Sequence, residues 1–245
     1  MSGSYLGPSF NEKEIEKSLN ELGANYTKIQ NEENLIDLVA NELSNKKIIG
    51  WFQGRMEFGP RALGARSIIA DPRSEKMQKD LNLKIKYRES FRPFAPSILI
   101  DDLSEWFDLN IESPYMLLVA KIKKNLQIPM NENEKKLFGI EKLNIKRSEI
   151  PAVTHLDYSA RVQTVNRYTN KKYYYLIKKF KEKTNCPLIV NTSFNVRGEP
   201  IVNTPLDAFN CFMGTDLDKL VIGNCYLDKD KQNPKLKRNY SKEFE

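Results

Sequence analysis

Apolar residues recur at helical spacing in two segments near the start of the chain, residues 11–22 and 32–43. In the first segment, Ile15 and Leu19 lie on one face of a helix, and Asn11 stands at the position of an N-terminal cap. The second segment repeats this spacing. Both segments therefore predict amphipathic helices.

Short apolar runs alternate with further helical segments along the rest of the chain. They predict strands at residues 48–52, 67–70, 115–120, 161–165, 187–190 and 220–222, and helices at 77–83, 171–181 and 205–213. We find no internal repeat. Helices interspersed with short strands indicate a mixed α/β, or α+β, domain.

Three segments fall outside this pattern. Residues 1–10 contain glycines and a proline that break any period, and we expect them to form a linker. Residues 121–149 are rich in Lys, Asn and Glu and predict a surface insertion. Residues 229–245 are charged and have no hydrophobic pattern, which is typical of a disordered tail. The predicted domain therefore spans residues 11–228.

The composition is that of an ordinary globular protein, with 40% hydrophobic and 29% charged residues in a chain of 245. No apolar run approaches the ~20 residues that cross a bilayer, and the first residues lack the apolar core of a signal peptide. Cys186, Cys211 and Cys225 form no C-x-x-C pair, so we expect neither structural zinc nor a disulfide framework. These features predict a cytoplasmic protein without a membrane partner.

The chain has a formal net charge of +7, and its arginines are concentrated in one segment. Residues 55–92 contain six of the eleven arginines, with four lysines and five acidic residues. A guanidinium group can bind phosphate or carboxylate through two parallel hydrogen bonds, whereas lysine is a mobile point charge. The excess of cations therefore predicts an anion-binding site, with structural ion pairs as the alternative.

Two polar segments supply candidate ligands for such an anion. The first follows the strand at 48–52, and its glycine spacing matches neither the P-loop nor the dinucleotide-binding motif. Its candidates, with those of the stretch that follows, are Arg55, Arg61, Arg66, Lys86, Arg88 and Arg92. The second segment begins after the strand at 187–190 and offers Asn191, Ser193, Asn195 and Arg197. For each of these residues taken singly, the alternative to binding an anion is a structural ion pair or a loop cap.

A histidine and a tyrosine-rich helix are further candidates. His155 is the single histidine. It is either part of the site or a structural residue whose hydrogen bonds are satisfied within the domain. Tyr173, Tyr174 and Tyr175 stand among lysines, an arrangement that can stack on single-stranded RNA. The pattern favours instead a helix that buries one or two tyrosines and exposes its lysines.

Four segments closely resemble the C-terminal domain of the O-carbamoyltransferases, the family of nodulation and antibiotic-tailoring carbamoyltransferases. They are GWFQGRMEFGPRALGARSIIADPR at 50–73, YRESFRPFAPSIL at 87–99, IPAVTHLDYSARVQTVNR at 150–167 and NTSFNVRGEPIVNTPLDAF at 191–209. The resemblance extends from about Gly7 to about Leu227. The sequence departs from the family pattern at Ala65, where Asn is common, and in the longer, more basic stretch 121–149.

The resemblance implies a YrdC-like fold, a twisted mixed sheet flanked by helices with a positively charged concave site. It implies that the domain binds carbamoyl phosphate and ATP with Mg²⁺, forms carbamoyl adenylate and holds no tightly bound metal of its own. A separate N-terminal, Kae1-like domain would then transfer the carbamoyl group to a hydroxyl acceptor. Because the chain begins where the family's second domain begins, we expect a separately encoded subunit or an excised domain.

The resemblance and the side-chain chemistry divide the candidates into two groups. Those assigned to catalysis at phosphate oxygens are Arg61, Lys86, Arg88 and Arg92. Those assigned to binding of substrate or nucleotide are Arg55, Arg66, His155, Arg161, Asn191, Ser193, Asn195 and Arg197. The alternative function is a catalytically silent nucleotide- or RNA-binding regulatory module. Nucleic acid is not the expected partner, because the matched segments are the cationic and polar loops rather than the Lys-rich surface.

Overall fold

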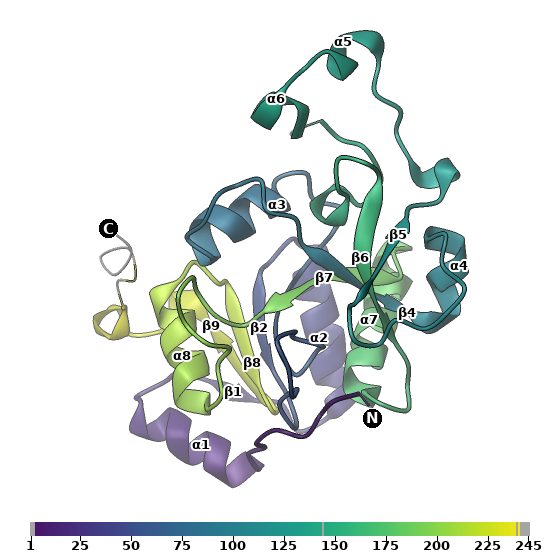
Figure 1. Ribbon diagram of the computed structural model, residues 1–245. Coiled ribbons are helices and arrows are strands. Elements are labelled where there is room, and N and C mark those ends of the chain that lie inside the picture. Colours follow the sequence, from purple (N-terminus) through teal and green to yellow (C-terminus); the bar gives the residue numbers. More distant parts are fainter. Residues whose placement is uncertain (1–2, 144, 239, 241–245) are drawn as a thin grey trace.

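The computed structural model describes residues 3–143, 145–238 and 240, and its centre is a nine-stranded mixed sheet (Figure 1). The strands are β1 (Thr27–Lys28), β2 (Ile49–Phe52), β3 (Arg66–Ala70), β4 (Ala95–Leu99), β5 (Leu118–Lys121), β6 (Ser159–Val165), β7 (Leu188–Ser193), β8 (Lys219–Ile222) and β9 (Cys225–Asp228). Their order in the sheet is β1-β9-β8-β2-β3-β7-β4-β6-β5. The pairs β2–β8 and β4–β6 are parallel, and the others are antiparallel. The predicted mixed α/β class is confirmed.

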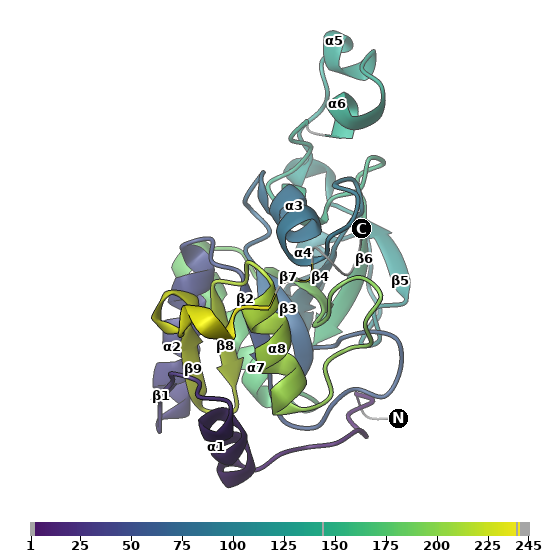
Figure 2. The ribbon, with the colours of Figure 1, turned by 90° about the vertical axis from the view of Figure 1, so that its left-hand side faces the viewer.

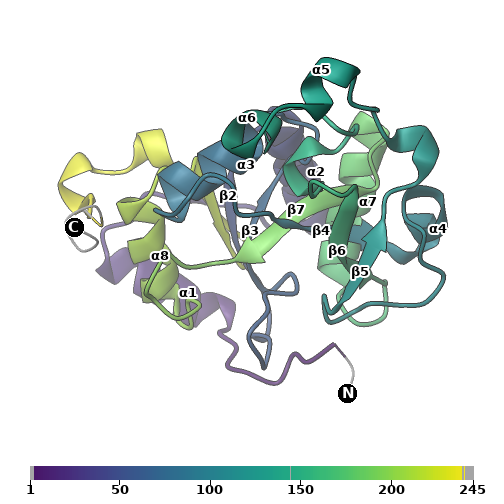
Figure 3. The same ribbon diagram turned by 45° about the horizontal axis from the view of Figure 1, so that its top comes forward.

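Helices cover both faces of this sheet. They are α1 (Glu12–Glu21), α2 (Glu32–Ser44), α3 (Met77–Asp80), α4 (Leu103–Trp106), α5 (Glu132–Lys135), α6 (Gly139–Leu143), α7 (Lys171–Thr184) and α8 (Pro205–Gly214). The helices α2 and α7 pack against each other behind the sheet, and α8 lies in front of it (Figure 3). Large side chains such as Trp51, Phe180 and Phe212 fill the spaces between these layers.

Local chemistry explains where the first helix begins. The side chain of Asn11 accepts a hydrogen bond from the backbone nitrogen of Glu14 at 3.0 Å, and the Glu14 carboxylate accepts one from the backbone nitrogen of Asn11 at 2.7 Å. This reciprocal capping box satisfies two amides that would otherwise lack acceptors. Ile15 and Leu19 are buried, as their spacing predicts.

Two strands near the polar segments differ from the sequence prediction. The strand β7 continues to Ser193, so Asn191 and Ser193 lie in the sheet rather than in a loop. The strand β4 was not predicted, because Pro96 within it lacks the amide hydrogen that a central strand normally donates. The first difference moves two candidate residues into the sheet, and the second adds a strand directly after the segment that carries Arg88 and Arg92.

The segment expected to be a linker contacts the domain, whereas the segment expected to be an insertion extends away from it. The stretch before α1 crosses the loop after β2, where the backbone nitrogen of Gly7 donates to the Met56 oxygen at 2.9 Å and that of Met56 donates to the Pro8 oxygen at 2.9 Å. The segment between β5 and β6, with α5 and α6, extends away from the sheet (Figure 2).

The described part of the C-terminal tail packs on the domain, contrary to the expected disorder. The amino group of Lys229 donates to the backbone oxygens of Phe212 and Thr215, at the end of α8, the latter at 2.9 Å. The Gln232 amide donates to the Asn25 backbone oxygen at 2.7 Å. These side chains bind backbone carbonyls at the end of α8 and in the loop before β1, and the contacts hold a charged segment that has no hydrophobic pattern against the domain. Residues 239 and 241–245 lie outside the described residues.

Candidate functional site

Residues from distant parts of the sequence meet in a pocket of about 130 Å³. Its wall comes from the loop between β2 and β3, the segment before β4, and the strands β6 and β7. Five of the predicted residues line it: Arg61, Arg88, Arg161, Asn191 and Ser193. The pocket thus combines both polar segments that the sequence indicated.

Two arginines of the pocket wall, one from the loop between β2 and β3 and one from β6, repel each other electrostatically. Arg61 is exposed, and Arg161 is half-buried on β6. Burial lowers the pKa of the Arg161 guanidinium, and the nearby positive charge of Arg61 lowers this pKa further. No acidic side chain lines the pocket among the described residues. A bound anion would relieve the repulsion between these like charges.

Arg88, the third cation of the pocket, is held by its neighbours. Its Nε donates to Oδ1 of Asn82 at 2.7 Å, and its guanidinium lies 5.0 Å from the centre of the Phe94 ring. Asn82 is buried, and its Nδ2 donates to the backbone oxygens of Ser90 and Arg92 at 3.0 and 2.9 Å. Because only Nε is engaged within the described residues, the two terminal nitrogens of Arg88 remain for a ligand.

Lys86 lies behind this wall rather than in it. It is 4% exposed, and its Nζ donates to the backbone oxygen and to Oδ1 of Asn195, both at 2.9 Å, and to the backbone oxygen of Ser193. Burial lowers the pKa of Lys86 to about 7. Lys86 and Asn195 therefore hold the end of β7 in place, and neither lines the pocket.

Arg66 is fully buried beneath the loop between β2 and β3. Its guanidinium donates to the backbone oxygens of Gln53 and Gly54 at 3.0 and 3.2 Å and of Pro8 at 3.2 Å. It also stacks 3.5 Å from the centre of the Phe52 ring. Burial lowers its pKa to about 10. These contacts give Arg66 a structural position, so the assignment of Arg66 as a ligand is not supported by the geometry.

Glu57 organises the same loop, although the sequence analysis did not select it. Its Oε1 accepts hydrogen bonds from the backbone nitrogens of Leu63 and Ala65, both at 2.6 Å, and of Arg66 at 3.3 Å. A buried carboxylate that gathers several amides fixes the path of the chain. The loop that presents Arg61 is therefore preorganised.

Four other candidates lie outside the pocket wall: Arg55, Arg92, His155 and Arg197. Arg55 donates to the Gly7 backbone oxygen at 2.9 Å and so ties the N-terminal segment to the loop. Arg92 pairs with Glu89 at 3.0 Å. Nδ1 of His155 lies 3.2 Å from the Ser159 hydroxyl, and burial lowers the pKa of its imidazole. Arg197 is exposed.

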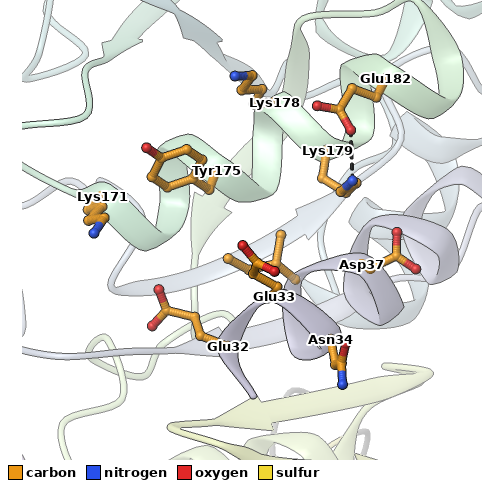
Figure 4. Close-up of a pocket in the computed structure, with 10 residues that line it drawn as sticks. Glu32, Glu33, Asn34, Asp37, Lys171, Tyr175, Lys178, Lys179 and Glu182 are labelled. Atoms are coloured by element: carbon orange, nitrogen blue, oxygen red, sulfur yellow. Dashed lines mark ion pairs between the residues drawn. The ribbon is translucent and has the colours of Figure 1, made fainter.

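A larger cavity, of about 600 Å³, lies between α2 and α7 (Figure 4). Glu32, Glu33 and Asp37 of α2 face Lys171, Lys178 and Lys179 of α7 across it. Because both signs of charge line this groove, it lacks the selectivity for anions that the smaller pocket has.

The tyrosine-rich face of α7 is mostly engaged within the domain. Tyr173 is fully buried, and the Tyr174 hydroxyl donates to Asp101 at 2.6 Å. Lysines of α7 pair with acids of other elements, as in Lys181–Asp102 at 2.6 Å. The burial of Tyr173 confirms the prediction of a helix that buries one or two of its tyrosines.

The described residues contain neither a cluster of metal ligands nor a helix able to cross a membrane. No group of three or more His, Cys, Asp and Glu side chains stands ready to hold a metal ion. Crossing a bilayer takes a helix of about 20 apolar residues, and none of the described helices meets that requirement.

Comparison with protein families relates most of the chain to one of them. The model of the carbamoyltransferase C-terminus matches residues 40–229. Nodulation protein NolO of Bradyrhizobium diazoefficiens is 41% identical over 89% of this chain, which spans 37% of that protein. The 3'-hydroxymethylcephem-O-carbamoyltransferase of Amycolatopsis lactamdurans is 31% identical over 79% of the chain, which spans 33% of it.

One further relative and one solved structure also match the chain. The protein sll1178 of Synechocystis, described as uncharacterized, is 53% identical over the whole chain, which spans 40% of it. A crystal structure of full-length HypF in the phosphate- and nucleotide-bound form matches 83% of the chain, with 16% identity and a TM-score of 0.44, and the match spans 22% of HypF. The chain thus spans less than half the length of each of these relatives.

Proposed function

Because this chain belongs to the carbamoyltransferase C-terminus family, we propose that it binds carbamoyl phosphate and ATP and forms carbamoyl adenylate. The observation that carries this proposal is the convergence of Arg61, Arg88 and Arg161 on one pocket whose described residues include no acid. Guanidinium groups bind phosphate oxygens through directed hydrogen bonds. The pocket is therefore assigned to the phosphate group of carbamoyl phosphate.

The size of the pocket supports a small anion rather than a whole nucleotide. A water molecule occupies about 30 Å³ of the liquid, so about 130 Å³ holds a few waters or one small acyl phosphate. In this proposal, the nucleoside of ATP lies outside the pocket.

The Glu89 carboxyl has a pKa lowered by a hydrogen bond to its own backbone and then by the charges of Arg92 and Arg197. We assign these two neighbouring cations to the ATP phosphates.

The proposed reaction has two chemical steps. Water cleaves the bond between the carbonyl carbon and the phosphoryl oxygen of carbamoyl phosphate, giving carbamate and phosphate, with one proton passing to phosphate and one to solvent. A carbamate oxygen then attacks the α-phosphorus of ATP, the bond to the β-phosphate oxygen breaks, and pyrophosphate leaves. The arginines stabilise the charge that develops on the transferring groups. Mg²⁺ arrives with ATP, because the described pocket wall offers no carboxylate ligand.

We infer that the adenylate serves a second, Kae1-like domain or subunit. That partner would transfer the carbamoyl group to a hydroxyl acceptor and release AMP. The greater length of the relatives supports this part of the proposal, since each of them has room for such a domain.

Phosphorus NMR of the purified chain with carbamoyl phosphate, ATP and Mg²⁺ tests the proposal. Pyrophosphate should appear only when both substrates are present, and samples lacking either substrate are the controls. A folded protein that releases phosphate but no pyrophosphate would refute adenylate formation by this chain alone.

A further inference from the structure

Asn82 is a fully buried residue whose polar atoms all bind the segment that carries Arg88 and Arg92. Its Oδ1 accepts a hydrogen bond from Nε of Arg88 at 2.7 Å, and its backbone oxygen accepts one from the Arg88 backbone nitrogen at 3.0 Å. Its Nδ2 donates to the backbone oxygens of Ser90 and Arg92. Because backbone carbonyls can only accept, the side-chain oxygen of Asn82 must be the atom that faces Arg88.

The backbone around Asn82 is shaped for this contact. In an α-helix, the Lys86 nitrogen would donate to the Asn82 oxygen. Residues Leu81–Ile85 form instead one turn of π-helix, in which the Lys86 nitrogen donates to the Leu81 oxygen at 2.9 Å. Such turns are rare and frequently lie at functional sites. The shift leaves the Asn82 oxygen for the backbone nitrogen of Arg88.

Tyr87 is a second unusual point of this backbone. Its φ is +46°, in the left-handed region that a bulky side chain rarely occupies. Its hydroxyl donates to the Gly214 backbone oxygen at 2.9 Å. Backbone strain of this kind persists only where surrounding contacts impose it, and it clusters at binding and catalytic sites. The contacts of Tyr87 and Asn82 therefore fix the chain at the position of Arg88.

We propose that Asn82 is a positioning residue, which acts through Arg88 on the phosphate group bound in the pocket. The inference rests on the proposed function, in which Arg88 binds this phosphate. The guanidinium of Arg88 is planar, so the contacts of its Nε with Asn82 and of its face with the Phe94 ring set the direction of its two terminal nitrogens. A donor that is held in place before the ligand arrives loses less conformational entropy on binding.

Gln78 is the matched control for this role. Its Nε2 donates to the backbone oxygens of Phe91 and Arg92 at 3.4 and 3.2 Å, so it supports the same segment as Asn82. Support of the backbone is thus common to both residues, whereas the bond to Nε of Arg88 comes from Asn82. A purely structural role predicts similar effects of Gln78→Ala and Asn82→Ala on ligand binding.

A double-mutant cycle, measured by calorimetric titration with inorganic phosphate, tests the inference. Asn82→Ala should weaken phosphate binding at least about tenfold when Arg88 is present, but less than about twofold in the Arg88→Ala background, because residues that act together are not additive. Gln78→Ala should bind phosphate within about threefold of wild type. Equal losses from Asn82→Ala in both backgrounds, or an equal loss in Gln78→Ala, would overturn the inference.

Nuclear magnetic resonance of the Arg88 Nε–H group in wild type gives a readout that does not depend on the folding of any variant. In the free protein, the bond to buried Asn82 should slow the exchange of this hydrogen with water at least about tenfold relative to the Nε–H of the exposed Arg167. If wild type binds no phosphate, the proposed function fails and the role of Asn82 fails with it. If wild type binds phosphate but the two Nε–H groups exchange equally fast, only the role of Asn82 is refuted.

Discussion

The Nζ atom of Lys86 lies 2.9 Å from Oδ1 of Asn195, although 109 residues separate them in the sequence. This contact joins the segment that carries Arg88 to the end of β7, where Asn191 and Ser193 line the pocket. Two motifs that are separate in the sequence therefore form one unit, and its geometry depends on a buried lysine.

Lys86 should make stability depend on pH. Burial lowers its pKa from 10.5 to about 7. Between these two pKa values, the unfolded chain holds a proton on Lys86 that the folded chain has released, so the free energy of unfolding rises with pH. Below about pH 7, Lys86 is protonated in both states, and its contribution to the free energy of unfolding is constant. Urea denaturation should show wild type gaining stability over Lys86→Met from pH 7 to about pH 9. Parallel pH profiles would indicate that Lys86 remains charged in the folded protein.

Arg61 and Arg88 should affect turnover without affecting folding. A preorganised donor to developing charge contributes ~3 to 4 kcal/mol to catalysis, so we expect Arg61→Ala and Arg88→Ala each to lower pyrophosphate release by at least about tenfold with little change in Tm. Arg167→Ala is the matched control, because this exposed arginine contacts Tyr168 at 2.8 Å, away from the pocket. Unchanged turnover in either pocket variant removes that residue from the site.

Glu57 should be important for stability. Glu57→Ala leaves the backbone nitrogens of Leu63 and Ala65 without their acceptor, since both now donate to Oε1. Hydrogen bonds to charged groups contribute about 1.5 to 3 kcal/mol each, so we expect a loss of roughly 3 kcal/mol or more in the free energy of unfolding. Glu57→Gln retains an acceptor oxygen and should lose less in chemical denaturation. Equal losses would locate the effect in the charge rather than in the hydrogen bonds.

Gly64 should tolerate no side chain. Its φ is +103°, and a Cβ atom there would lie 2.4 Å from the ring of Tyr173. Gly54 also has a positive φ, +52°, but a Cβ there would meet no atom within 4 Å. In thermal denaturation, Gly64→Ala should therefore lower Tm much more than Gly54→Ala, whose expected cost is about 1 kcal/mol of backbone strain. Similar losses would mean that Tyr173 moves aside easily.

Local signals in the sequence specify the family and most of the helices and strands. The caps and apolar spacings of α1, α2, α7 and α8 are local signals, and the structure confirms these helices near their predicted limits. The family resemblance rests on four motifs, and the match over residues 40–229 confirms it. The arginine-rich segment before residue 93 supplies Arg61 and Arg88 to the pocket.

Which polar residues face the pocket depends on how the whole chain folds. Arg61 and Arg66 belong to one motif, yet the first lines the pocket and the second is buried against Phe52. Sequence spacing does not reveal this difference, because burial depends on contacts with residues far along the chain. Asn82, which contacts Arg88, gave no signal in the sequence for the same reason. Residue types therefore indicate which groups could bind an anion, whereas long-range packing and hydrogen bonding decide where each side chain lies.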